Sequence, residues 1–110
     1  MTGVTAISEL VPLLTGPFSH LELGQVNDHA AYVMKFEGSF PMHAHTRDEM
    51  YVVLEGEIFI DFKIGPRLVV RRGESTVVRA YTTHSSGSVD GALVLMIKPK
   101  EMFLNPSELE

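Results

Sequence analysis

Three histidines and one glutamate stand at spacings that suit metal coordination: His43, His45, Glu49 and His84. Residues two apart on a strand point to the same side, so the imidazoles of His43 and His45 can converge on one point. Glu49 opens the next apolar run and can bring a carboxylate back to that point. His84 can supply a fourth ligand if the sheet folds it across the first three. Together these residues predict a metal site.

Each of these residues has a simpler interpretation when it is taken alone. A single His-x-His pair usually consists of surface or core histidines, and His84 alone could be a turn residue bonded to a carbonyl. His20 and His29 are interpreted as ordinary histidines of this kind. We favour the metal site because three of the five histidines and one acid fall on a single pattern.

The chain has the size and composition of one domain. Its 110 residues are 45% apolar, enough for a core, and we expect a single domain over residues 1–110. The barrel core is expected at about residues 30–99, and residues 100–110, with Pro106 and an acidic end, are predicted to form a loosely held tail. Cysteine is absent, so thiolate ligands are excluded and a reducing, cytoplasmic location is expected.

Charge and hydropathy argue against two classes of partner. The net charge is −5, and the arginines form no basic stripe with interleaved aromatic residues, so we expect no nucleic-acid binding. No apolar stretch approaches the roughly 20 residues that cross a bilayer, so no membrane association is expected. A phosphate-binding glycine loop and a Ser-His-Asp arrangement are also missing, so neither nucleotide chemistry nor serine hydrolysis is supported.

Apart from one helical segment, the chain is predicted to consist of strands. Short runs rich in Val, Ile, Phe and Tyr are separated by turn signals, which is typical of an all-β sandwich or barrel. A short N-terminal helix is expected over Ser8–Leu14, with Ser8 as N-cap and Pro12 limiting its extension. The expected turns lie at Gly24–Asp28, Gly38, Gly56, Gly65–Pro66, Gly73, Ser85–Ser88 and Asp90–Gly91.

Alternation along the strands predicts which faces are buried. Tyr32, Met34 and Phe36 share one face, opposite charged neighbours, and should point inward. Two segments, Met50–Leu54 and Ala92–Ile97, are apolar on both faces. Strands of that kind need cover on each side, from a second sheet or from a partner subunit.

Two segments resemble the two sequence motifs of the cupin family. The stretch Gly38–Gly56, which contains the histidine pair, resembles the first motif, and Gly73–His84 resembles the second. The resemblance implies a cupin-type jelly-roll β-barrel, or double-stranded β-helix, of about six to eight strands. It also implies one divalent metal ion held by the four residues named above. Arg79 and Tyr81 stand where the family commonly has proline and glycine, so Tyr81 predicts a different or a strained turn.

The expected ligands suit one divalent transition metal ion. Imidazole and carboxylate favour Mn, Fe, Co, Ni, Cu or Zn over Ca or Mg, without choosing among the six. Around the site, Met34, Phe36, Tyr51 and Val53 are predicted to line a mainly apolar pocket for a small organic molecule, although such residues are more often plain core. Tyr51 is the one candidate catalytic group beyond the ligands, as a proton donor or an orienting group.

These expectations combine into a functional hypothesis. We expect a metal-dependent enzyme that acts on a small organic molecule, dioxygenase-like in the first place and an isomerase or lyase in the second. The alternative is a non-catalytic module that binds or senses a metal or small ligand, because cupin barrels resemble one another across enzymes, storage proteins and sensors. The resemblance also implies a homodimer.

Overall fold

The protein is built from antiparallel β-strands with one short helical segment at its N-terminal end. The computed structural model describes residues 3–100, and the all-β prediction is confirmed over them; apart from Lys100, the predicted tail lies outside this range. No helix among these residues is both long and apolar enough to cross a membrane. The elements in chain order are α1 (Ile7–Leu10), the 3-10 helix η1 (Val11–Leu13), β1 (His20–Val26), β2 (His29–Ser39), β3 (Glu49–Phe62), β4 (Leu68–Arg71), β5 (Ser75–Val78) and β6 (His84–Pro99).

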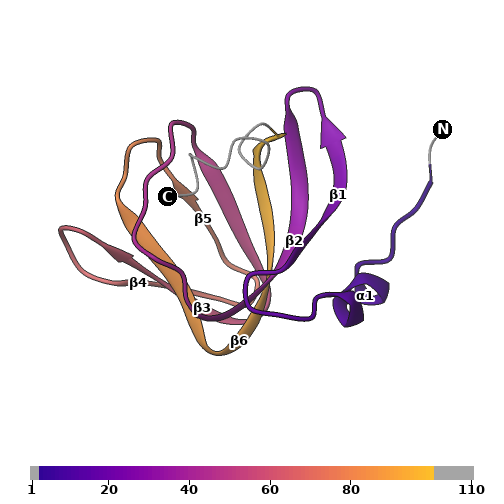
Figure 1. Ribbon diagram of the computed structural model, residues 1–110, viewed down its shortest axis with the longest axis horizontal. Helices are drawn as coiled ribbons and strands as arrows, with labels where there is room; N and C mark the ends of the chain where they lie inside the picture. Colours follow the sequence, from indigo (N-terminus) through magenta and orange to yellow (C-terminus); the bar gives the residue numbers. More distant parts are fainter. Residues whose placement is uncertain (1–2, 101–110) are drawn as a thin grey trace.

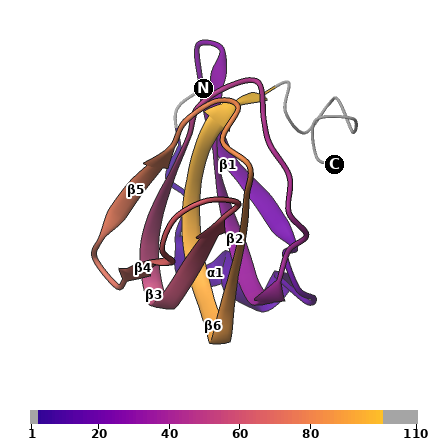
Figure 2. The same ribbon diagram turned by 90° about the vertical axis from the view of Figure 1, so that its left-hand side faces the viewer.

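The strands form one curved sheet in the order β1-β2-β6-β3-β4, and β5 pairs with β3. β6 lies between β2 and β3 and is antiparallel to both. The first residues of β3 also pair with β5, and its later residues pair with β4. Figures 1 and 2 show the sheet curling, so that β1 and β2 rise on one side of the fold and β3, β4 and β5 on the other. This curvature gives the jelly-roll barrel its inner face.

Glycine bulges bend the two longest strands. Gly56 in β3 and Gly91 in β6 have φ values of 81° and 94°, and a Cβ at Gly56 would lie 2.5 Å from the Gly91 carbonyl oxygen. The pairing of the strands shifts register on β3 at this point, as in a β-bulge, which bends a strand without ending it. The turns predicted at Gly56 and Asp90–Gly91 are therefore wrong. A positive φ is needed in a bulge as well as in a turn, and glycine supplies it in both.

The turn predicted at Ser85–Ser88 is also wrong, because these residues belong to β6. Ser86 and Ser88 are buried, and the Ser88 hydroxyl donates at 2.7 Å to the carbonyl oxygen of Glu57 in β3. A buried hydroxyl is tolerated within a strand when a backbone acceptor replaces water. Serine composition alone does not distinguish this arrangement from a turn.

The core lies on the inner face of the sheet. Tyr32, Met34 and Phe36 are buried, so the inward alternation predicted for β2 is confirmed. In the two segments that are apolar on both faces, alternate residues are buried and the intervening ones are half-buried on the outer face. The main core cluster consists of Met34, Phe36, Tyr51, Val53, Ile58, Ile60, Val70, Val78, Ala92, Val94 and Met96.

The predicted N-terminal helical turn is confirmed, but it starts earlier than expected. α1 begins at Ile7 with Ala6 as N-cap, so Ser8 lies inside the helix and does not cap it. The first turn is closed by the backbone alone, because the Glu9 N–H donates to the Ala6 carbonyl oxygen at 3.0 Å. A serine side chain is therefore not needed to start this short helix.

Candidate metal centre

Backbone pairing brings His43 and His84 together. His43 lies between β2 and β3, His84 is the first residue of β6, and the two form an isolated antiparallel bridge. The His43 N–H donates to the His84 carbonyl oxygen at 2.8 Å, and the His84 N–H donates to the His43 carbonyl oxygen at 2.9 Å. His45 follows two residues after His43, so its side chain can reach the same point. His84 is thus folded across the histidine pair, as the metal-site hypothesis requires.

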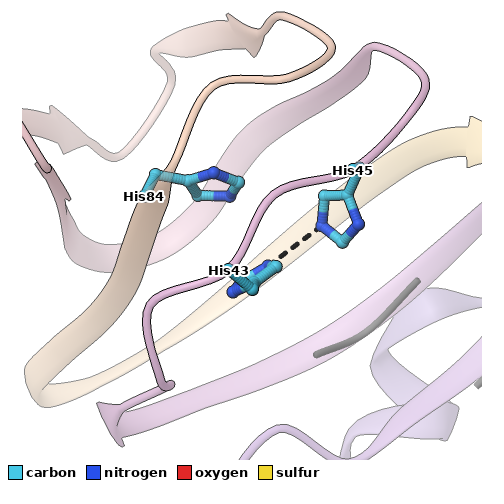
Figure 3. Close-up of side chains that lie close together, drawn as sticks. All are labelled: His43, His45 and His84. Atoms are coloured by element: carbon cyan, nitrogen blue, oxygen red, sulfur yellow. Dashed lines mark hydrogen bonds between the residues drawn. The ribbon is translucent and has the colours of Figure 1, made fainter. Parts of the chain in front are cut away.

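The three imidazoles point toward one another, as Figure 3 shows. Each offers one ring nitrogen, these nitrogens all lie within 4.8 Å of one another, and all three residues are buried. The Nε2 atoms of His43 and His45 are 2.9 Å apart. Two nitrogens that bind one ion at about 2.0–2.1 Å and at right angles to each other lie that far apart. The spacing of this pair therefore suits metal coordination.

Backbone carbonyls fix the orientation of two of the rings. Nδ1 of His43 lies 2.7 Å from the Pro41 carbonyl oxygen, and Nδ1 of His84 lies 2.8 Å from the Thr82 carbonyl oxygen. Because a carbonyl oxygen only accepts, each Nδ1 carries the proton and donates it. Nε2 of each ring is then left with a lone pair aimed into the site. This is the usual way in which a ligating histidine is held.

Nε2 of His84 provides a test of whether a metal ion fits. The side chain is fully buried, and this nitrogen has no hydrogen-bond partner among the described residues. It faces Oε1 of Glu49 at 3.5 Å, so a lone pair meets a carboxylate oxygen. That arrangement is unfavourable in a buried site unless a positive charge lies between the two atoms. The residues therefore fit a bound cation.

Burial keeps the first two histidines in the form that binds metal. It lowers the pKa of His43 and of His45 below the ordinary histidine value, while the nearby charges of Glu49 and Lys98 act in opposite directions. Both rings are therefore neutral at pH 7. Since a metal ion binds the unprotonated nitrogen, no proton has to be removed from these rings at that pH.

Glu49 brings a carboxylate to the edge of the histidine cluster. It is the first residue of β3, and its Oε1 lies 3.5 Å from Nε2 of His45 as well as from Nε2 of His84. The Tyr51 hydroxyl donates to the same oxygen at 2.5 Å. Burial alone would raise the pKa of Glu49, but the Lys98 ammonium and the Tyr51 hydroxyl hold it well below its usual range. The carboxylate is therefore charged and lies against two of the three histidines, although, among the described residues, the group of ligand atoms within 4.8 Å of one another contains the three histidines alone.

Lys98 is a site residue that the sequence interpretation missed. Only 3% of it is exposed, and its Nζ lies 3.2 Å from Oε2 of Glu49. Burial lowers the pKa of Lys98, and the Glu49 carboxylate opposes that shift. Strand alternation could have found this lysine, because the buried residues Ala92, Val94 and Met96 lead to it in steps of two.

A different or a strained turn was predicted at Tyr81, and the turn between β5 and β6 has a strained backbone at this residue. Tyr81 has a φ of 64°, in the left-handed region that favours glycine. Its N–H donates to the His45 carbonyl oxygen at 2.7 Å. Asp48 holds the same turn by accepting the Ala80 N–H at 2.7 Å and the Arg79 guanidinium at 3.1 Å. These bonds tie the turn to the segment that carries the first two histidines.

A cavity of about 140 Å³ lies beside the histidines. Of the four residues expected around a pocket, Met34 and Tyr51 line this cavity, whereas Phe36 and Val53 lie in the core cluster and not at its wall. The other lining residues, beyond the proposed ligands, are Phe18, His20, Phe40, Met96 and Lys98. Phe18 and Phe40 lie outside the segments whose buried faces were predicted from alternation, so that pattern could not identify them.

Comparison with protein families and with known proteins gives a consistent result. A family model described as the cupin domain matches residues 32–98. The uncharacterized protein YdbB of Bacillus subtilis (strain 168) is 31% identical over 84 residues, which are 76% of this chain and 74% of that protein. Both matches include the region of the proposed ligands in the first motif.

Solved structures share the fold. A cupin-2 domain containing protein from Shewanella frigidimarina NCIMB 400 aligns with a TM-score of 0.82 and 25% identity, over 87% of this chain and 94% of the other. The hydroquinone 1,2-dioxygenase PnpCD, crystallised in complex with Cd²⁺ and 4-hydroxybenzonitrile, aligns with a TM-score of 0.70 and 16% identity, over 81% and 68% of the two chains. At this low identity, the second likeness concerns the fold alone.

Proposed function

Given that this chain belongs to the family of cupin-domain proteins, we propose that it binds one divalent transition metal ion and acts as a metal-dependent enzyme on a small organic molecule. The proposed ligands are His43, His45, Glu49 and His84. The observation that carries the proposal is the buried Nε2 of His84, which faces the Glu49 carboxylate and has no hydrogen-bond partner within residues 3–100. Mn, Fe, Co, Ni, Cu and Zn suit these nitrogen and oxygen ligands.

In this proposal, the groups around the proposed ligands orient them, and the bound ion supplies the chemistry. A bound ion of this kind would supply Lewis-acid or redox chemistry. The carbonyls of Pro41 and Thr82 hold two of the imidazoles, and the Tyr51 hydroxyl holds one oxygen of Glu49. Burial, followed by the charge of Glu49, raises the pKa of Tyr51 well above its ordinary value. Tyr51 therefore keeps its proton at neutral pH and orients the carboxylate as a donor, and it does not serve as a general base.

Among reaction classes, we favour a dioxygenase-like reaction, with isomerase or lyase chemistry second. The cavity supports this choice, because it can hold a small organic molecule against mainly apolar walls beside the proposed ligands. PnpCD is a dioxygenase with this fold, which adds support at the level of architecture. Apolar walls also limit the access of water to the site.

A screen for turnover tests the enzymatic proposal. Purified protein is loaded with Fe(II) or Mn(II), its metal content is measured, and phenols, thiols and keto acids are supplied in air. We expect substrate-dependent oxygen uptake or product formation, and we expect His45→Ala to lack it. The proposal fails if the metal-loaded protein consumes no oxygen and forms no product with any of these compounds.

A binding module without turnover is the second candidate function. Glu49 favours it, because Tyr51 and Lys98 already engage its two oxygens and Glu49 is the one carboxylate among the described lining residues. A site of this kind has no carboxylate left to act as a base. One bound metal ion per chain, together with no turnover in the screen above, would support this candidate.

We also propose that the protein forms a homodimer through the outer face of β3 and β6. Met50 pairs with Ile97 and Val52 pairs with Leu95, and all four side chains are half-buried on that face. A second copy would remove this apolar surface from water. Light scattering at micromolar concentration tests the proposal, since a molar mass of 12.2 kDa would contradict it. The cytoplasmic location stays a prediction.

A further inference from the structure

The cavity beside the proposed metal site is small and mostly apolar. Its volume is about 140 Å³, and a cavity of about 150 Å³ in another protein holds benzene. Phe18, Phe40, Met34 and Met96 form much of the wall, and the rings of Phe18 and Phe40 lie edge to face with centroids 5.2 Å apart. A ligand that fills this space has an apolar body of about one ring.

The polar end of the cavity carries a lysine. Lys98 lines the cavity with Glu49, and it is the one lysine or arginine among the described lining residues. A lysine is almost never buried without a compensating partner, and here its Nζ lies 3.2 Å from Oε2 of Glu49. An apolar side chain like that of Met96, on the same face of β6, would serve packing alone. The position of Lys98 therefore points to a role in the site.

The charges at this end of the cavity do not balance once a divalent ion is bound. Histidines bind metal as neutral rings, and Lys98 cancels the charge of Glu49, so the full charge of the ion remains uncompensated. Such charge is unfavourable next to apolar walls, and an anionic ligand compensates part of it.

We propose that this cavity binds small apolar molecules with one anionic oxygen group, of the class of monocyclic carboxylates, and that Lys98 sets the preference for the anion. The proposal rests on the metal site proposed above. The apolar walls would hold the ring, while the ammonium of Lys98 and the metal-bound end of the cavity would face the carboxylate. Replacement of Lys98 by an uncharged residue of similar length removes one positive charge from this end and leaves the walls in place.

Benzoate and benzamide are suitable probes, because they have the same ring and similar size and differ in charge. Their dissociation constants are measured by calorimetry on the full chain loaded with Zn(II), after metal analysis has shown one ion per chain. We expect wild-type protein to bind benzoate roughly tenfold more tightly than benzamide. This preference should fall about fivefold in Lys98→Met and persist in Lys98→Arg. Absence of binding, absence of the preference, or an unchanged preference in Lys98→Met would overturn the proposal.

The same binding measurements on metal-free protein distinguish the effect of Lys98 on the benzoate preference from the effect of the ion and from damage to the fold. Lys98→Met and Glu49→Gln break the same ion pair but leave opposite charges in the cavity. The benzoate preference should fall in Lys98→Met and rise in Glu49→Gln, relative to metal-free wild type. Damage to the fold would change both variants in the same direction, and that result would contradict the proposal. Failure of the metal site itself would be seen in the metal analysis, independently of this comparison.

Discussion

The Tyr81 N–H donates to the His45 carbonyl oxygen at 2.7 Å, and Tyr81 makes this bond with a φ of 64°. A residue in the left-handed region thus holds the segment that carries a proposed metal ligand. This conformation costs a non-glycine residue roughly 1–2 kcal/mol. Strain of this kind tends to be kept at functional sites, where the surrounding structure enforces it.

Replacement of Tyr81 by glycine should relieve this strain. The side chain is exposed, so little packing is lost, and we expect the free energy of unfolding to rise by about 0.5–1 kcal/mol. Urea denaturation of metal-free protein measures the change. Tyr81→Ala is the matched control, because it removes the ring and keeps the Cβ that causes the strain. A gain in stability that is equal in both variants would show that the ring, and not φ, is responsible.

Asp48 should make stability depend on pH through the same turn. The Ala80 N–H, followed by the Arg79 guanidinium, lowers the pKa of Asp48 below its ordinary value of 3.8. A depressed folded-state pKa stabilises the fold above the unfolded-state pKa, and this contribution is lost as the pH falls through the folded-state value. Asp48→Ala should therefore lower Tm at pH 7, and the difference from wild type should shrink below pH 4. A difference in Tm between Asp48→Ala and wild type that stays the same from pH 7 to pH 3 would contradict this role of Asp48.

Removal of proposed ligands should remove the metal. Protein as isolated is expected to carry one transition metal ion per chain, and His45→Ala and His84→Ala should each lose most of it. Elemental analysis with a protein assay measures the ratio, and His29→Ala is the control because His29 is exposed and paired with Asp28. Full metal content in His84→Ala, with loss in His45→Ala, would leave three ligands and contradict the role of His84.

How far apart the contacting residues lie in the sequence explains how much of the candidate site could be predicted from it. His43, His45 and Glu49 are close in the chain, so alternation and a single turn are enough to bring them together. The position of His84 depends on its bridge to His43, a long-range pairing that spacing alone does not specify. Lys98 follows the alternation of β6, but it was missed because an inward lysine is rare without a partner.

The same limit applies to the fold. The all-β class follows from the frequency of short apolar runs and turn signals, and it is correct for the described residues. Some turns were predicted wrongly because glycine and serine occur both in turns and within strands. Gly56 and Gly91 have the positive φ of a turn but lie in bulges. Ser88 is a buried strand residue whose hydroxyl donates to a carbonyl oxygen of the neighbouring strand. Only the pairing of β3 with β6 distinguishes these cases.

Removal of the Tyr51 hydroxyl should weaken the metal site without disturbing the core. Tyr51→Phe keeps the buried ring and takes one donor from Oε1 of Glu49. We expect metal affinity to fall about 10–100-fold, as it does when groups that orient ligands are lost. The free energy of unfolding of metal-free protein should fall by about 1–3 kcal/mol, because a buried carboxylate oxygen loses its partner. Tyr81→Phe removes an exposed hydroxyl and is the control; equal affinity in Tyr51→Phe and wild type would contradict the orienting role.

The crossing of β3 and β6 at Gly56 should tolerate an added methyl group poorly. Gly56 has a φ of 81°, and a Cβ there would lie 2.5 Å from the Gly91 carbonyl oxygen, closer than van der Waals contact allows. Gly91 has a φ of 94°, but a Cβ there would meet its nearest neighbour, the Phe36 carbonyl oxygen, at 3.9 Å. Gly56→Ala combines backbone strain with a clash, whereas Gly91→Ala introduces strain alone.

We therefore expect Gly56→Ala to lower the free energy of unfolding by about 2–4 kcal/mol and Gly91→Ala by about 1–2 kcal/mol. Gly24→Ala, where a Cβ meets nothing within 4 Å, should change it by less than about 0.5 kcal/mol. Urea denaturation of the three variants gives the order directly. If Gly56→Ala were no more destabilising than Gly91→Ala, the two strands would be able to separate at the crossing, and the close approach would not determine the bend that positions β6 against β3.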